Sequence, residues 1–162
     1  MPIVELSVNT EEVLENIDML RAAFLNAVAQ VQPVFGAFMP YSYYAEYGSW
    51  NYGPNLSITN ALQNNADWIS SRFMEEFMPA LERALKRKSV AGLRKELVVI
   101  WEDILNDKPR IEAAANARYL TGMHSESIAG YATEAGVEDA IQRGIARNEE
   151  RAAILSRMRA SK

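Results

Sequence analysis

The chain offers few side chains that could carry out chemistry. Its one histidine, His124, lies in a Gly-Met-His-Ser-Glu-Ser stretch, and there is no cysteine. The lack of cysteine excludes disulfides, thiolate nucleophiles and cysteine-based metal sites, and it favours an intracellular origin. A Ser-His-acid site would need a geometry that spacing does not show, and no Gly-x-Ser-x-Gly turn accompanies the histidine. We expect His124 to be a loop or helix-cap residue, with a catalytic role as the alternative.

Acidic side chains are the other candidates for chemistry. Glu102, Asp103 and Asp107 fall close together, and the two aspartates are four residues apart, which places them near one helix face. No histidine and no Asp-x-Asp loop accompany them, so solvated acidic surface is the first interpretation and a divalent metal site the alternative. The chain also lacks a phosphate-binding loop and a dinucleotide fingerprint. We expect no cofactor, no metal and no enzymatic activity.

Aromatic residues gather in one segment. Eight of the fifteen Phe, Tyr and Trp residues fall between Phe35 and Tyr52, a stretch without Lys or Arg. Such a density is typical of a packing surface or of a contact surface for a partner. The residues that we expect to bind a partner here are Tyr41, Tyr43, Tyr44, Tyr47, Trp50 and Tyr52. Packing of alternate tyrosines on the protein's own helices stays open as the alternative, because successive strand residues face opposite sides.

Charge is unevenly spread along the chain. Residues 1–70 hold one basic residue, Arg21, against seven acidic ones, whereas six basic residues face two acidic ones from Arg143 onward. Such a chain can stack head-to-tail with its own copies or place its basic end on an acidic neighbour. The alternative is a solvated helix with a frayed end. The basic residues that we expect to bind a partner are Arg143, Arg147, Arg151, Arg157 and Arg159.

These patterns argue against nucleic acid as a partner. A single-strand platform needs cationic side chains between its aromatic ones, and the only charge of the aromatic segment is Glu46. No run of 18 apolar residues is present, and the first residues lack the basic and apolar regions of a signal peptide. We therefore expect a soluble protein that is not exported and has no membrane partner.

The elements expected in the first half are a strand, a helix and an aromatic strand. Residues 3–8 alternate like a short strand, and Asn9 is placed to cap a helix that Pro33 stops. Residues 34–47 favour one strand broken at Pro40, or two short strands. A single long helix is then expected from near Ser57 to Lys88, with a kink or break at Pro79.

Helices dominate the expected second half. Ser89 should cap a helix, Pro109 should close it or open the next, and that short helix should run to Tyr119 and stop at Gly122. A last helix with a thin apolar stripe is expected at residues 137–158. The sequence predicts an α+β protein in which long amphipathic helices pack on a small antiparallel sheet. Residues 1–136 would be one domain, and residues 137–162 a helical extension that orders on assembly.

Several of these stretches resemble the tail-completion or neck proteins of tailed bacteriophages. The stretches are Pro-Tyr-Ser-Tyr-Tyr-Ala-Glu-Tyr-Gly-Ser at 40–49, Asn-Ala-Leu-Gln-Asn-Asn at 60–65 and Phe-Met-Glu-Glu-Phe at 73–77, and the similarity covers residues 3–88. That family commonly carries a proline-tyrosine strand that ends in an acidic-aromatic-glycine-threonine turn. It usually has a Thr-Gly-x-Leu-x-x-Ser-Ile element before this strand. Here the nearest counterpart, residues 121–128, follows the tyrosines and has His124 in place of Leu.

The resemblance implies a virion structural protein, copied around a ring at the head-to-tail junction and made in the host cytoplasm. Its partners would be further copies of the chain and other neck, portal or tail proteins. The second hypothesis is a small helical regulator or inhibitor that binds one host protein through the aromatic 35–52 surface. Copy number separates the two, because a regulator binds one-to-one and a neck protein forms a ring.

Overall fold

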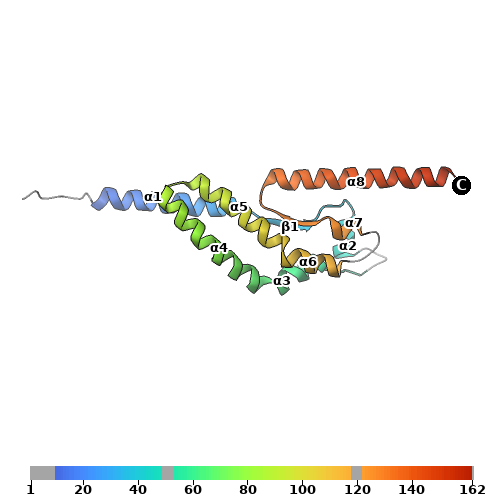
Figure 1. Cartoon of the computed structure of the whole chain (residues 1–162), viewed down its shortest axis with the longest axis horizontal. Helices are drawn as coiled ribbons and strands as arrows, with labels where there is room; N and C mark the ends of the chain where they lie inside the picture. Colours follow the sequence, from blue (N-terminus) through green and yellow to red (C-terminus); the bar gives the residue numbers. More distant parts are fainter. Residues whose placement is uncertain (1–9, 49–52, 118–121, 162) are drawn as a thin grey trace, which may run out of the picture.

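The protein is a set of helices built around a two-stranded antiparallel sheet (Figure 1). The computed structural model describes residues 10–48, 53–117 and 122–161. The expected α+β fold with a helix-rich second half is confirmed. In chain order the elements are α1 (Thr10–Gln30), β1 (Val34–Ala37), α2 (Ser42–Tyr47), α3 (Ser57–Asn64), α4 (Ala66–Arg87), α5 (Val90–Asn106), α6 (Lys108–Asn116), α7 (Met123–Glu126), β2 (Ile128–Tyr131) and α8 (Glu134–Ala160).

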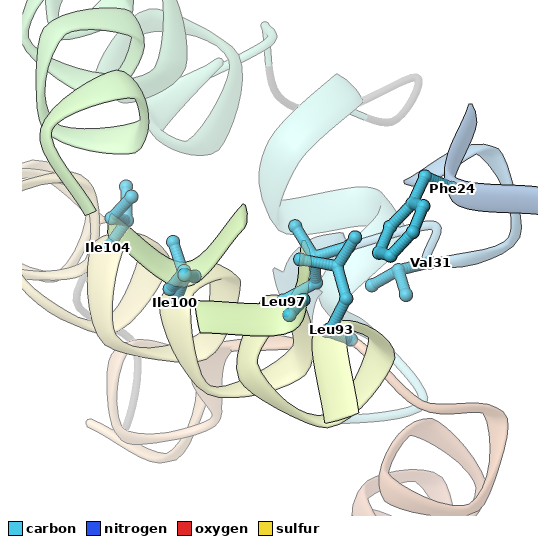
Figure 2. Close-up of a cluster of buried hydrophobic side chains, with 9 residues drawn as sticks. Phe24, Val31, Leu93, Leu97, Ile100 and Ile104 are labelled. Atoms are coloured by element: carbon cyan, nitrogen blue, oxygen red, sulfur yellow. The ribbon is translucent and has the colours of Figure 1, made fainter. Parts of the chain in front are cut away.

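The main core lies where α1, α4 and α5 meet. Helix α5 is central because its buried side chains Leu93, Leu97, Ile100 and Ile104 recur every three or four residues and form one face. Figure 2 shows Phe24 and Val31, from α1 and the segment after it, packed toward this face. Aromatic rings of α4 and α5 close the other side: Phe73 stacks on Trp101 with ring centroids 4.5 Å apart. Burial of these side chains holds the three helices together.

Local signals set the helix ends in this part of the chain. Ser89 caps α5 as expected, since its Oγ accepts a hydrogen bond from the Gly92 N–H at 3.0 Å. Pro109 lies in the first turn of α6, where its missing N–H costs nothing, so it opens that helix. Helix α8 has the same type of N-cap, since Thr133 Oγ1 accepts a hydrogen bond from the Gly136 N–H at 3.1 Å. Helix α8 therefore begins at Glu134, three residues before the expected start.

The sheet joins two segments that are far apart in sequence. Strands β1 and β2 pair antiparallel, with Val34 opposite Tyr131 and Ala37 opposite Ile128. Strand β2 lies against α5 and α6. A second, smaller core of Ala61, Ala113, Ala117 and Ile128 forms beneath it, with Phe35, Ala37 and Ile58 packed around. The small residues allow α3 and α6 to approach each other closely.

The predicted aromatic strand is wrong beyond residue 37. Residues 34–37 form β1, but Ser42–Tyr47 form the short helix α2. Ser42, Ala45 and Glu46 are buried and share one side of this helix, as residues three and four apart do. The aromatic content favours a strand, and the polar contacts of Ser42 and Glu46 override that propensity. The expectation that alternate tyrosines face opposite sides therefore does not hold.

The expected long helix from Ser57 to Lys88 is two helices. The chain breaks at Asn65, between α3 and α4, whereas α4 continues through Pro79. Pro79 is exposed, so water can satisfy the carbonyl that loses its hydrogen bond. Asn65 is held instead by its side chain, whose Nδ2 donates to Glu112 Oε2 at 2.6 Å.

Two further expectations concern the remaining boundaries. Helix α6 ends at Asn116, before the predicted end, and Gly122, with φ of 76°, precedes α7. Tyr119, the predicted strand at 3–8 and the predicted cap Asn9 lie outside the described residues.

Among the helices that the structure describes, none combines the length and the apolar character needed to cross a lipid bilayer.

Helix α8 is held to the rest of the molecule along its first half only. Its buried residues are Ala140 and Gly144, and a Cβ at Gly144 would collide with the carbonyl of Phe38. Beyond Arg151 every described residue of α8 is exposed. In Figure 1 this second half extends past the body, at the opposite end of the molecule from α1.

Candidate interaction surface

Helix α2 presents three tyrosines to solvent on one face. The exposed fractions are 66% for Tyr43, 61% for Tyr44 and 54% for Tyr47. Their rings contact one another, with centroids 5.8 Å apart for Tyr43 and Tyr44 and 5.0 Å apart for Tyr43 and Tyr47. We call these three residues the tyrosine face. Exposed aromatic side chains in mutual contact are typical of the anchor residues of protein interfaces.

Glu46 fixes the tyrosine face from beneath. Its side chain is buried, and its carboxylate accepts hydrogen bonds from Ser57 Oγ (3.1 Å), the Ile58 N–H (3.0 Å), the Thr59 N–H (2.9 Å) and Thr59 Oγ1 (3.1 Å). These groups form the first turn of α3, so the carboxylate caps that helix from outside and meets its positive end. A buried charge is tolerated here because donors surround it.

The main chain of Glu46 also connects α2 to the segment before α3. Its carbonyl accepts the N–H groups of Asn55 (2.9 Å) and Leu56 (3.0 Å), and Leu56 adopts φ of 51°, which is uncommon for a residue with a side chain. One residue therefore ties α2 to the start of α3 through six donor groups. The tyrosine face is thus presented by a fixed backbone.

Ser42 and His124 make a second buried contact under α2. His124 Nδ1 and Ser42 Oγ share a hydrogen bond of 3.0 Å, and both side chains are buried. His124 Nε2 is also buried and has no partner among the described residues. Burial lowers the pKa of His124, and the nearby Glu46 charge offsets part of that effect. The imidazole therefore favours its neutral form.

This grouping of Ser42, His124 and Glu46 lacks the connections of a catalytic triad. In a triad the carboxylate holds the imidazole nitrogen that faces away from the serine. Here the Glu46 carboxylate is taken up by Ser57, Ile58 and Thr59, and the serine is buried. The arrangement positions α2 against α7. His124 was expected in a loop or at a cap, and it lies within the short helix α7.

The five candidate arginines fall into two groups. Arg143 pairs with Asp139 at 2.9 Å and donates to Tyr131 Oη at 3.1 Å, and Arg147 pairs with Glu126. Arg151 lies 3.8 Å from the Met123 sulfur. These three contact the body of their own chain. The other two, Arg157 and Arg159, are exposed near the end of α8 and form no ion pair within the described residues.

The remaining candidates are placed as follows. Tyr41 is half-buried at the N-cap of α2, and Trp50 and Tyr52 lie outside the described residues. Glu102, of the expected acidic cluster, accepts the Ala132 N–H at 3.1 Å. No group of three or more His, Asp or Glu side chains within the described ranges is placed to hold a metal ion.

Sequence reasoning missed an apolar groove between α1 and α4. The groove holds about 470 Å³, and the side chains that line it are Ile17, Leu20, Arg21, Phe24, Leu25, Val28, Phe77, Leu81 and Leu85. The two helical stripes were visible as periodic apolar residues, and periodicity assigns such a stripe to a core. Nothing in the spacing tells whether the stripe is covered by its own chain.

Comparison of the chain with models of protein families, with curated proteins and with solved structures finds no match. The resemblance over residues 3–88 therefore stays a prediction.

Proposed function

We propose that the protein is a non-enzymatic structural subunit of a tailed-bacteriophage virion, acting at the head-to-tail junction as part of a neck or tail-completion ring. The observation that carries the proposal is the tyrosine face. Three contacting, solvent-exposed tyrosines sit on a helix whose buried side is fixed by Glu46 and Ser42. A fixed aromatic surface loses little entropy on docking, so it suits a protein that works by joining others.

The position of the segment around His124 also supports the proposal. The resembled family carries a Thr-Gly-x-Leu-x-x-Ser-Ile element before its tyrosine segment, and here the counterpart comes later in the chain. In space the two stretches are neighbours. The Phe38 N–H donates to the Ser127 carbonyl at 3.4 Å, His124 bonds to Ser42, and Ile128 pairs with Ala37. The counterpart of this element therefore contacts the segment that carries the tyrosines, although it follows that segment in the chain.

The polar chemistry beneath the tyrosine face is consistent with a structural role. The Glu46 carboxylate is occupied by donors of α3, and the imidazole of His124 is held by Ser42 under α2. Each of these groups stabilises a junction between elements.

The test is to measure assembly and to look for the protein in particles. Analytical ultracentrifugation of the purified chain over a wide concentration range should detect an oligomer with a defined copy number. Mass spectrometry of purified virus particles, made from the genome that encodes the chain, should detect it as a component. A chain that stays monomeric at high concentration and is absent from particles contradicts the proposal. A one-to-one complex with a single host protein supports the regulator instead.

The tyrosine face can be tested in the same particles. Combined replacement of Tyr43, Tyr44 and Tyr47 by Ser should reduce the amount of the protein in particles. Ile111→Ser is the matched control, because Ile111 is equally exposed and lies on a different helix, α6. Equal incorporation of both variants would show that the tyrosines do not anchor the subunit.

A further inference from the structure

The groove between α1 and α4 is an apolar surface that its own chain leaves open. Several of its side chains are largely solvent-exposed, including Ile17, Leu20, Leu25 and Leu85. Met74 and Met78 of α4 are half exposed and extend the apolar character along that helix. Contiguous exposed apolar surface of this kind on a folded protein is typical of a binding site.

The end of α8 has the shape and chemistry of an occupant for this groove. Ile154, Leu155 and Met158 are 49%, 44% and 60% exposed and lie on one side of the helix. They continue the side on which Ala140 and Gly144 pack against the body. Helix α8 therefore has one apolar side, of which the first half is covered and the second half is bare.

A chain cannot place its own α8 end in its own groove. Figure 1 shows α1 and the end of α8 at opposite ends of the molecule. Helix α8 is also held in direction by Gly144 on the Phe38 carbonyl and by the Arg147 pair with Glu126. An occupant with the chemistry of α8 must therefore come from another copy.

We propose that the end of α8, residues 151–160, docks into the α1–α4 groove of a second copy of this chain. The inference rests on the self-assembly in the proposed function and names the two surfaces that would carry it. The contact is heterologous, because groove and helix end are different patches. Repeated contacts of this type produce a closed ring or an open filament, according to the rotation between subunits.

Charge at the two surfaces favours this pairing. Residues 151–160 contain three arginines and no acidic residue, whereas α1 carries Glu15 and Asp18 beside the groove residue Ile17, and Arg21 is the basic residue of α1 that lines the groove. Arg157 and Arg159 flank the bare side of α8, and Asp18 flanks the groove side of α1, as helical spacing requires. In this pairing Leu155 enters the groove and Arg157 lies near Asp18 of the second copy. Such charge pairs set register and orientation.

The experiment uses one variant of each surface and then their mixture. Leu155→Glu alters the helix end, and Leu25→Glu alters the groove; both residues are exposed, so the fold should survive, which circular dichroism checks. Each variant alone should weaken self-association by at least about tenfold. An equimolar mixture should form dimers and no larger species, because only one intact groove meets only one intact helix end. Ile111→Glu is the control for an added charge elsewhere and should assemble like the wild type.

A charge exchange tests whether Arg157 and Asp18 meet. Arg157→Glu and Asp18→Arg should each weaken assembly, and the double variant should recover it. If neither Leu155→Glu nor Leu25→Glu weakens assembly, the end of α8 does not dock into the α1–α4 groove. The proposed function would still stand. Two weakened variants whose mixture forms no dimer also overturn this contact. A wild-type chain that is monomeric at every concentration overturns this contact, and its absence from particles as well would overturn the proposed function.

Discussion

The tyrosine face on α2 and the end of α8 are both exposed, and they differ in what supports them. Beneath the tyrosines lie a buried carboxylate with a full set of donors and a buried serine–histidine contact. Beyond Arg151, by contrast, every described residue of α8 is exposed. Exposure alone therefore does not separate a surface that is ready to bind from one that gains its support only on binding. The groups beneath the surface make that distinction.

The largest expected effect comes from removing the support of the tyrosine face. Glu46→Gln replaces a buried acceptor of several N–H and O–H groups by an amide that has only one oxygen. We expect the free energy of unfolding to fall by about 3 kcal/mol, because donors at the start of α3 lose a charged partner. Urea denaturation measures this change.

The control for that substitution is Glu75→Gln. Glu75 is exposed on α4 and pairs with Arg72 at 3.7 Å, so its loss should change stability by no more than about 0.5 kcal/mol. Equal effects of the two substitutions would mean that α2 is held no more firmly than an exposed helix surface, and the contrast with α8 would disappear.

Glu46 also shows where sequence reasoning reaches its limit. The ends of α5 and α1 were predictable, because Ser89 and Pro33 act within a few residues of the helix that they start or stop. Helix α2 was not, because its formation depends on contacts with Ser57 and His124, which are distant in sequence. The signal in the sequence was Glu46, the only charged residue of the aromatic segment. Such a residue indicates that its charge has a partner, but the sequence does not identify that partner.

The candidate interaction surface was also predictable only in part. The aromatic density of residues 35–52 and the basic C-terminal end could be predicted from the residue types and their positions in the sequence. The separation of Arg157 and Arg159 from the three other arginines was not, because it depends on where α8 leaves the body. The groove was visible only as two apolar stripes, and its open side depends on the tertiary packing of α1 and α4 on α5.

The second prediction concerns the attached half of α8. Gly144→Val places side-chain atoms against the Phe38 carbonyl, so α8 must move away from the body. We expect a loss of about 1 to 3 kcal/mol and faster hydrogen exchange along α8, with little change in α5. Hydrogen exchange read by mass spectrometry resolves the two helices.

Ala146→Val is the matched control, because Ala146 is exposed on the same helix and gains the same kind of side chain. If Gly144→Val exchanges no faster than Ala146→Val, the contact with Phe38 does not hold α8. The comparison between a supported and an unsupported half of α8 would then have to be abandoned.

The third prediction is a pH dependence that belongs to the support of the tyrosine face. Burial lowers the pKa of His124 in the folded protein, so below the ordinary value of about 6.5 the unfolded chain binds a proton that the folded chain resists. The stabilising contribution is complete above that value and is lost as the pH falls toward the lowered pKa. One group can change the free energy of unfolding by at most about 1.4 kcal/mol per pH unit.

Urea denaturation in steps from about pH 8 to about pH 5.5 measures that slope. His124→Gln should flatten it, since the chain has no other histidine. A slope that persists unchanged in this variant would assign the pH dependence to other groups and would remove His124 from the account of how α2 is held.

The smallest expected effect is at the boundary between the two halves of α8. Arg147 pairs with Glu126 of α7, and both side chains are about half exposed, so water and salt weaken the attraction. Arg147→Gln should lower the free energy of unfolding by about 0.2 to 1 kcal/mol, and less at high salt. Arg157→Gln, which removes a charge without a described ion pair, should leave stability unchanged and weaken only assembly. If both substitutions act alike on stability, the two groups of arginines are not distinct, and the end of α8 is bound to its own body in solution.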